Sequence, residues 1–164
     1  MSDLSLPDTE VNDFLAKKKE IDGKMKWKNK GKAYLEWSSI LLDEDGISIP
    51  TARIILTANQ DEELYKFTFV IDYRGQNIRR LDIDDTHRRT NPYTCAEYPG
   101  VRIEGNHMHV WSQDNGINCA VPIDIPARDK THREWFEFFL NDVKLIYNNE
   151  HIAPPLTKGY PRLF

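Results

Sequence analysis

ISIPTARIILTANQDEELYKFTFVIDYRGQNIRRLDID, residues 47–84, is the stretch that decides the fold. It contains three runs rich in β-branched and aromatic residues, which favour extended strands. The runs are 47–58, 64–73 and 77–84. Asn59-Gln60-Asp61 and Arg74-Gly75 separate them, and both combinations are typical of turns. Because connections this short join antiparallel neighbours, the stretch predicts three adjacent antiparallel strands.

The strand pattern continues on both sides of this stretch. Residues 33–42 form a strand-like run upstream, and an alternating run at 101–111 is followed by a shorter one at 117–123. The last two flank Asp114-Asn115-Gly116, a good hairpin turn. We therefore predict an α+β fold with a single mostly antiparallel sheet of about six or seven strands, within residues 24–123.

Helices are predicted at the two ends of the chain. The first covers about residues 8–22, because Pro7 and Asp8-Thr9 give start signals and Gly23 stops the helix. The second covers about residues 131–148, where an aromatic stripe is expected to lie on one face of the sheet. The stripe consists of Trp135, Phe136, Phe139, Leu140, Val143, Ile146 and Tyr147. Residues 149–164 are expected to form a surface tail, so that residues 1–164 make one domain.

Composition indicates a cytoplasmic globular protein. The chain has 164 residues, of which 40% are hydrophobic and 29% charged, so it can bury a core. No apolar run approaches the roughly 20 residues that cross a bilayer, and the first residues lack the pattern of a secretory signal, so no membrane partner is expected. Cys95 and Cys119 are expected to be free thiols, as is usual in that compartment.

A row of lysines is the candidate nucleic-acid-binding segment. In an extended chain these lysines share one face, while Met25 and Trp27 lie on the other. Such a row neutralises phosphate charge, although the net charge of −4 gives no global support for nucleic-acid binding. The alternative is that the lysines protect an edge strand and that Trp27 belongs to the core. The row consists of Lys24, Lys26, Lys28, Lys30 and Lys32.

Histidines two residues apart, in His107-Met108-His109, form the most distinctive motif for chemistry. In a strand the two imidazoles share one face, where they can divide into general acid and general base or bind a metal. A second polar face comes from the preceding run, where Arg80, Asp82 and Asp84 alternate with apolar residues. If the two strands are neighbours, these groups converge.

The segment between these strands is expected to be a loop that carries further functional groups. It covers residues 86–93 and includes His87 and Arg88. Together with the two strands, it concentrates histidines, arginines and aspartates within a short part of the chain.

The order of these motifs resembles an uncharacterised bacterial domain-of-unknown-function family of similar length. The resemblance covers roughly residues 8–145, with the distinctive motifs between 80 and 122. The motifs are Arg80-Leu81-Asp82, His87-Arg88, Asn91-Pro92, His107-Met108-His109 and Ala120-Val121-Pro122. More distantly, the layout is similar to TumE-type toxins of toxin–antitoxin pairs. This implies a small cytoplasmic toxin-like protein that acts on RNA and has a protein partner, either an antitoxin or a host target.

The leading functional hypothesis is therefore a toxin-like, RNA-directed enzyme, a metal-independent ribonuclease without a cofactor. One of His107 and His109 takes the proton from the ribose 2′-hydroxyl, and the other, or His87, protonates the leaving oxygen. Arg80 or Arg88 stabilises charge on the phosphoryl oxygens. Asp82 orients a histidine and fixes its tautomer.

The histidine motif is also compatible with two different roles. A divalent metal at His107 and His109, completed by Asp82, Asp84 or His87, suits zinc, manganese or iron. The second role is purely structural, with the motif as a polar part of a solvated sheet face.

The competing class is a non-catalytic bacterial or phage protein that binds a protein partner through acidic surfaces. Its acidic clusters are 43–45, 61–63 and 82–85, and the aromatic end 160–164 is a further docking segment. The alternative is that these clusters are solvated turns.

Overall fold

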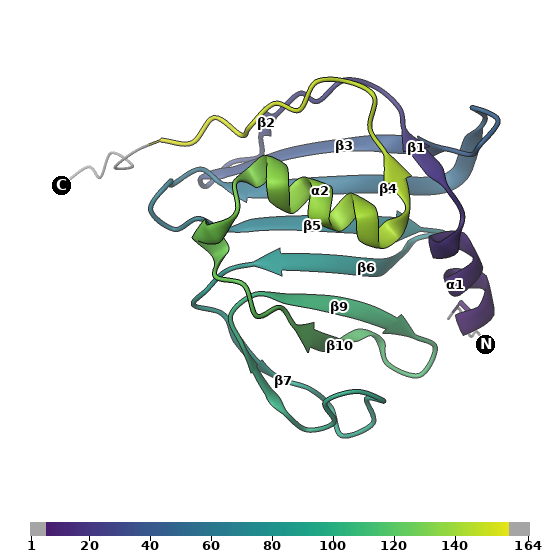
Figure 1. Cartoon of the computed structure of the whole chain (residues 1–164), viewed down its shortest axis with the longest axis vertical. Coiled ribbons are helices and arrows are strands. Elements are labelled where there is room, and N and C mark those ends of the chain that lie inside the picture. The colour runs from purple at the N-terminus through teal and green to yellow at the C-terminus, as the bar shows by residue number, and fades with distance from the viewer. Residues whose placement is uncertain (1–5, 158–164) are drawn as a thin grey trace.

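The computed structural model describes residues 6–157, in which two helices accompany a large curled sheet (Figure 1). The strand order is β10-β9-β6-β5-β4-β3-β1-β11, and β2 also pairs with β3. The strands of this sheet are β1 (Lys19–Ile21), β2 (Lys28–Asn29), β3 (Tyr34–Leu42), β4 (Ser48–Asn59), β5 (Phe67–Tyr73), β6 (Gln76–Ile83), β9 (His107–Ser112), β10 (Gly116–Pro122) and β11 (Leu145–Ile146).

The three strands predicted from residues 47–84 are confirmed as β4, β5 and β6, paired antiparallel in sequence order. The predicted sheet as a whole needs correction. It has nine strands rather than six or seven, and it is mixed rather than mostly antiparallel, because β1 and β11 pair in parallel. The additional strands β1, β2 and β11 are two or three residues long, too short to produce a periodic pattern.

The first helix, α1 (Asp8–Ala16), ends earlier than the predicted residue 22. The Lys19 ammonium group donates hydrogen bonds to the carbonyls of Phe14, Leu15 and Lys17, and so satisfies acceptors that the helix end leaves free. The chain then runs directly into β1, which takes the place of the last predicted turns.

The second helix, α2 (His132–Val143), is also shorter than predicted. Thr131 and Glu134 form a capping box at its start, and Lys144, with a left-handed φ of 58°, ends it. A short 3₁₀-helix, η1 (Ala127–Asp129), precedes α2. No helix within residues 6–157 is long and apolar enough to span a membrane.

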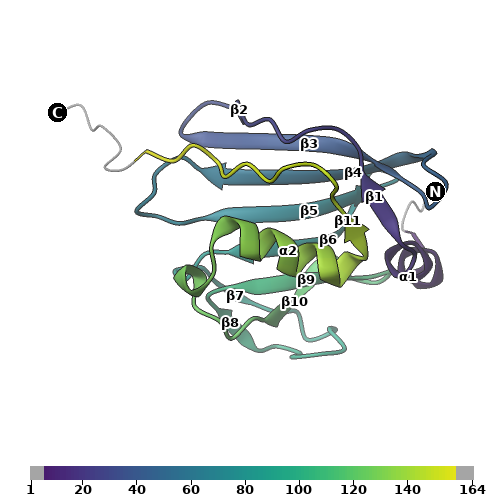
Figure 2. The ribbon, with the colours of Figure 1, turned by 45° about the horizontal axis from the view of Figure 1, so that its top comes forward.

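Helix α2 lies across one face of the sheet, as the aromatic stripe predicts (Figures 1 and 2). Trp135, Phe136 and Phe139 are buried, and Phe136 and Phe139 pack on Phe69 of β5. No helix within residues 6–157 covers the opposite face, called the open face below (Figure 2). The side chains of alternate strand residues point to this face because successive strand residues face opposite ways.

A two-stranded hairpin, the flap, lies beside β9 and β10. It consists of β7 (Arg88–Thr90) and β8 (Arg102–Glu104) with the intervening turn. The predicted loop at 86–93 therefore contains a strand, and the predicted strand at 101–111 is two strands. The break falls at Gly105, whose φ of 81° is favoured by glycine.

A disulfide and hydrogen bonds join the flap to β10. Cys95 and Cys119 form a disulfide, so the prediction of two free thiols is wrong. Cysteine pairing depends on proximity in space, which residues 24 apart in sequence do not reveal. The buried Asn91 amide also donates to the Ala120 carbonyl and accepts from the Ala120 amide.

Candidate metal centre

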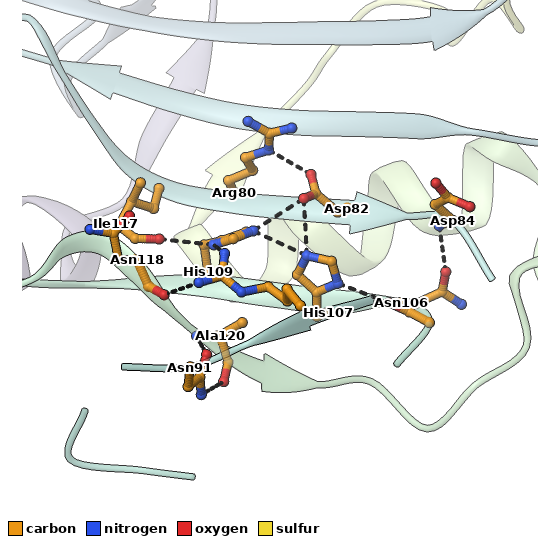
Figure 3. Close-up of polar contacts among 12 residues, drawn as sticks. Arg80, Asp82, Asp84, Asn91, Asn106, His107, His109, Ile117, Asn118 and Ala120 are labelled. Atoms are coloured by element: carbon orange, nitrogen blue, oxygen red, sulfur yellow. Dashed lines mark hydrogen bonds and ion pairs between the residues drawn. The ribbon is translucent and has the colours of Figure 1, made fainter. Parts of the chain in front are cut away.

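The two polar strand faces meet because β6 and β9 are neighbours in the sheet. Arg80 lies opposite His109, and Asp82 lies opposite His107. All four side chains come from alternate positions on the open face, while Met108 turns to the core. The structure therefore brings together the groups that were expected to converge only if the strands were adjacent (Figure 3).

Three potential ligand atoms meet at one point between the strands. The Nε2 atoms of His107 and His109 each lie 3.1 Å from Asp82 Oδ2, and they are 3.1 Å from each other. His107 has no exposed surface, and His109 and Asp82 are also buried. Of the residues described, these three form a group with the composition and spacing of a metal site.

The backbone fixes the tautomer of both imidazoles. His107 Nδ1 lies 2.8 Å from the Gly105 carbonyl, and His109 Nδ1 lies 2.8 Å from the Ile117 carbonyl (Figure 3). A carbonyl can only accept, so each Nδ1 carries a hydrogen and donates it. In the neutral ring Nε2 is then an unprotonated acceptor, aimed at the carboxylate. The three facing atoms are then all acceptors, so a cation must lie between them: a bound metal ion, or a proton on Nε2 that makes the hydrogen bond to Asp82 Oδ2.

The irregularities of the local backbone supply these carbonyls. Gly105 has a left-handed φ of 81° just before β9. In β10 the pairing register shifts between Gly116 and Cys119, a bulge that takes the Ile117 and Asn118 carbonyls out of the regular ladder. The Ile117 carbonyl then accepts from His109, and the Asn118 carbonyl accepts from Arg89 of the flap.

Arg89 also lies near His109, with Nη1 3.4 Å from Nδ1. A guanidinium can only donate, so this longer contact does not compete with the carbonyl at 2.8 Å for the hydrogen on Nδ1. Burial lowers the pKa of Arg89, which remains a cation near neutral pH because the usual value is so high.

Asp82 is held as an ionised carboxylate. Burial alone would raise its pKa, but hydrogen bonds with His107 and His109 and the charge of Arg80 hold the pKa well below its usual range. Arg80 Nε donates to Oδ1 at 2.6 Å, which leaves Oδ2 directed at the histidines.

Sequence reasoning missed Asn106, which joins the ends of β6 and β9. Its buried side chain accepts from the Asp84 amide and donates to the Ile125 carbonyl and to Asp85 (Figure 3). A polar residue directly after a glycine was the only signal available.

The remaining predicted site residues lie at different distances from the centre. His87 stacks on His107 with ring centroids 5.0 Å apart and is exposed. Arg88 forms an ion pair with Glu104 across the flap, so it does not contribute to the centre. Asp84 pairs with Lys66 at 3.6 Å and is not a second carboxylate ligand.

The lysine row is exposed at all five positions, and Met25 is buried, as an extended segment predicts. Trp27 is half-buried, contacts His132 and donates to the Ile152 carbonyl at 2.7 Å. It therefore packs against the body of the protein rather than offering a free ring.

Two of the acidic clusters contribute to turns. Asp43 Oδ1 accepts from the amides of Asp45 and Ile47, and Asp61 Oδ1 accepts from the Glu63 amide. In the third cluster, Asp82 is part of the centre. The predicted docking end at 160–164 lies outside the described residues.

Comparisons with family models, curated proteins and solved structures give no match for this chain. The geometry of the site therefore carries the functional argument. Two imidazole nitrogens and one carboxylate oxygen form a ligand set that suits zinc and divalent iron or manganese.

Proposed function

We propose that Asp82, His107 and His109 bind a divalent transition metal and that the protein is a metal-dependent, RNA-directed hydrolase. One observation carries the metal proposal: both Nδ1 atoms donate to backbone carbonyls, so three acceptor atoms face one another within 3.1 Å. Histidines that bind a metal usually donate their other ring N–H to an outer partner such as a backbone carbonyl.

The metal-dependent scheme fits the burial better than the metal-independent one. A general base must reach the proton that it removes, but His107 is 0% exposed and both Nε2 atoms point toward Asp82. A bound divalent ion supplies an activated water and polarises a phosphoryl oxygen. The chain itself contributes the orientation of the ligands and the charge of Arg80.

RNA is the substrate class suggested by the toxin resemblance, and two features support it. Arg80 bonds to Asp82 through Nε, so its Nη groups remain to contact a phosphate. The exposed lysines Lys24, Lys26, Lys28 and Lys30 line a hollow with Glu36 and Ser38 on β3, at the far edge of the sheet. These cations are suited to the backbone of a strand that extends away from the centre.

Metal binding is tested first, by titrating Zn²⁺ and Mn²⁺ into the metal-free protein in a calorimeter. We expect one ion per chain, lost in Asp82→Asn and His109→Gln and retained in the matched control His151→Gln. Equal binding by all four proteins, or none by the wild type, contradicts the metal centre. Circular dichroism confirms that the variants fold.

RNA cleavage is tested separately with a labelled RNA pool. Cleavage that needs the added ion and disappears in Asp82→Asn supports the proposal. Cleavage that resists EDTA and requires the histidines supports the metal-independent scheme instead. Metal binding without cleavage contradicts the RNA-directed activity alone.

The non-catalytic interaction protein is the competing proposal. It predicts that reversing charges at Glu44 and Glu62 weakens capture of a protein partner, while Asp82→Asn leaves capture unchanged. The opposite pattern contradicts it.

A further inference from the structure

A cavity of about 440 Å³ lies beside the proposed metal centre. Its volume is within the roughly 300–1,000 Å³ of small-molecule sites. It extends over β3 to β6, and three strand spacings of about 4.8 Å give it a span of roughly 14 Å. Its wall includes Tyr34, Ile55, Val70, Asn77, Arg80 and Asp82.

The cavity floor is formed by paired residues of β4 and β5. Ile55 lies opposite Val70, and Thr57 lies opposite Thr68, to which it is hydrogen-bonded. These pairs make one apolar half and one hydroxyl-bearing half. One hydroxyl donates to the other, so the pair leaves one hydroxyl hydrogen that a ligand can accept.

The two ends of the cavity differ in chemistry. At the β6 end, Arg80 is part-exposed, and within residues 6–157 it bonds to the protein only through Nε. At the β3 end, Tyr34 is 48% exposed and offers an aromatic ring. Asn77 is exposed and lines the β6 side of the cavity, opposite Asp72.

The charged side chains at the β6 end balance one another in the absence of a metal. The Asp82 carboxylate is compensated by Arg80, and the Asp84 carboxylate is paired with Lys66. His87 lines the same end. A divalent cation at the centre would add positive charge there, so an oxyanion is the complementary group.

We propose that this cavity binds one nucleotide unit of the substrate, with its phosphate at Arg80 and its base against Tyr34. The inference rests on the proposed function and names the subsite that faces the metal centre. An aromatic ring and a guanidinium match the base face and the phosphate of a nucleotide. The roughly 14 Å span accommodates a single unit.

Binding is measured with adenosine 5′-monophosphate, adenosine and inorganic phosphate by calorimetry in EDTA, so that no metal is needed. We expect the monophosphate to bind more tightly than either part. Arg80→Gln should weaken monophosphate binding about ten-fold and leave adenosine binding unchanged. Tyr34→Ala should weaken monophosphate and adenosine binding about ten-fold and leave phosphate binding unchanged.

Two matched controls remove the same side chains elsewhere. Arg88→Gln removes an arginine that pairs with Glu104, and Tyr93→Ala removes a tyrosine that is 87% exposed on the flap. Neither residue lines the cavity. Both variants should bind the monophosphate like the wild type.

Three results overturn the inference. They are no monophosphate binding at millimolar concentration, equal losses in the cavity variants and the controls, and phosphate binding as tight as monophosphate binding. If the wild type still binds Zn²⁺ in any of these cases, the proposed metal centre is not contradicted. If the wild type binds the monophosphate but not Zn²⁺, the result contradicts the metal centre and supports the nucleotide subsite.

Discussion

The fold contains two histidine pairs with nearly the same spacing and opposite surroundings. His107 and His109 have their Nε2 atoms 3.1 Å apart, and His132 Nδ1 lies 2.9 Å from His151 Nε2. The first pair meets a carboxylate and is anchored by backbone carbonyls. The second pair has no carboxylate ligand within the described residues. Close imidazoles alone therefore do not define a site, because their partners decide what they can bind.

The second pair is part of the aromatic core. His132 packs edge-on against Phe67 and contacts Phe69, and His151 contacts Phe136. Burial, followed by the neighbouring His151, lowers the pKa of His132 to about 3. A neutral His132 thus joins α2 to the segment that follows β11.

The largest expected difference between the pairs concerns acid stability. The pKa of His132 is about 3 in the folded protein and 6.5 when unperturbed, so between these pH values the unfolded chain binds a proton that the folded chain does not. Stability is fully present above pH 6.5 and falls as the pH drops toward 3, by roughly 4–5 kcal/mol in all. Urea unfolding at pH 7.5 and 4.5 measures the loss, and His132→Phe should reduce it. If the pH dependence of stability is unchanged in this variant, His132 is not the cause of the acid sensitivity.

The second prediction is that removing the disulfide affects the region of the first histidine pair but not that of the second. The Cys95→Ser/Cys119→Ser protein should lose about 3 kcal/mol of unfolding free energy, because its unfolded chain is less restricted. Hydrogen exchange should increase in β9 and β10 and remain unchanged in α2. Treating the variant with a dithiol reductant is the control and should have no further effect. An equal increase of hydrogen exchange in both regions would show that the disulfide does not stabilise β9 and β10 selectively.

Asp82→Asn should break the proposed site without affecting the second pair. Loss of the ionised ligand is expected to weaken Zn²⁺ binding about 100-fold, or about 2.7 kcal/mol. Competition with a chromogenic chelator measures the affinity. His151→Gln, a change within the other pair, should leave the Zn²⁺ affinity unaltered.

The smallest expected effect tests whether the bulge in β10 positions the Ile117 carbonyl for His109. Arg89→Gln removes the donor that holds the Asn118 carbonyl beside the Ile117 carbonyl, and should weaken Zn²⁺ binding about ten-fold. The His109 Nδ1 hydrogen should also become more mobile by nuclear magnetic resonance. A loss of affinity without that change would indicate that Arg89 acts only through its charge.

Periodicity predicted the parts of the fold that depend on local pattern. It placed the strands between 47 and 84, the aromatic stripe of α2 and the shared face of His107 and His109. It could not establish that β6 and β9 are neighbours, because the flap separates them in sequence. The short strands depend on pairing with distant strands, and the early end of α1 depends on the Lys19 ammonium group just beyond the helix.

The chemistry of the centre was harder to predict than its residues. Choosing between acid–base catalysis and metal binding requires the hydrogen-bond partner of each Nδ1. Those partners come from a glycine turn and a bulge, which are set by the pairing register rather than by composition. The disulfide was missed for the same reason, since it depends on where the flap packs.

The disulfide also links the flap covalently to β10. The chain from Cys95 to Cys119 is a closed ring that contains both His107 and His109. A protease cut at the exposed Tyr98 would open this ring without releasing a fragment, because both new ends stay attached through the sulfur bridge. The histidine strand would therefore remain linked to its neighbours after a nick that would otherwise divide the protein in two.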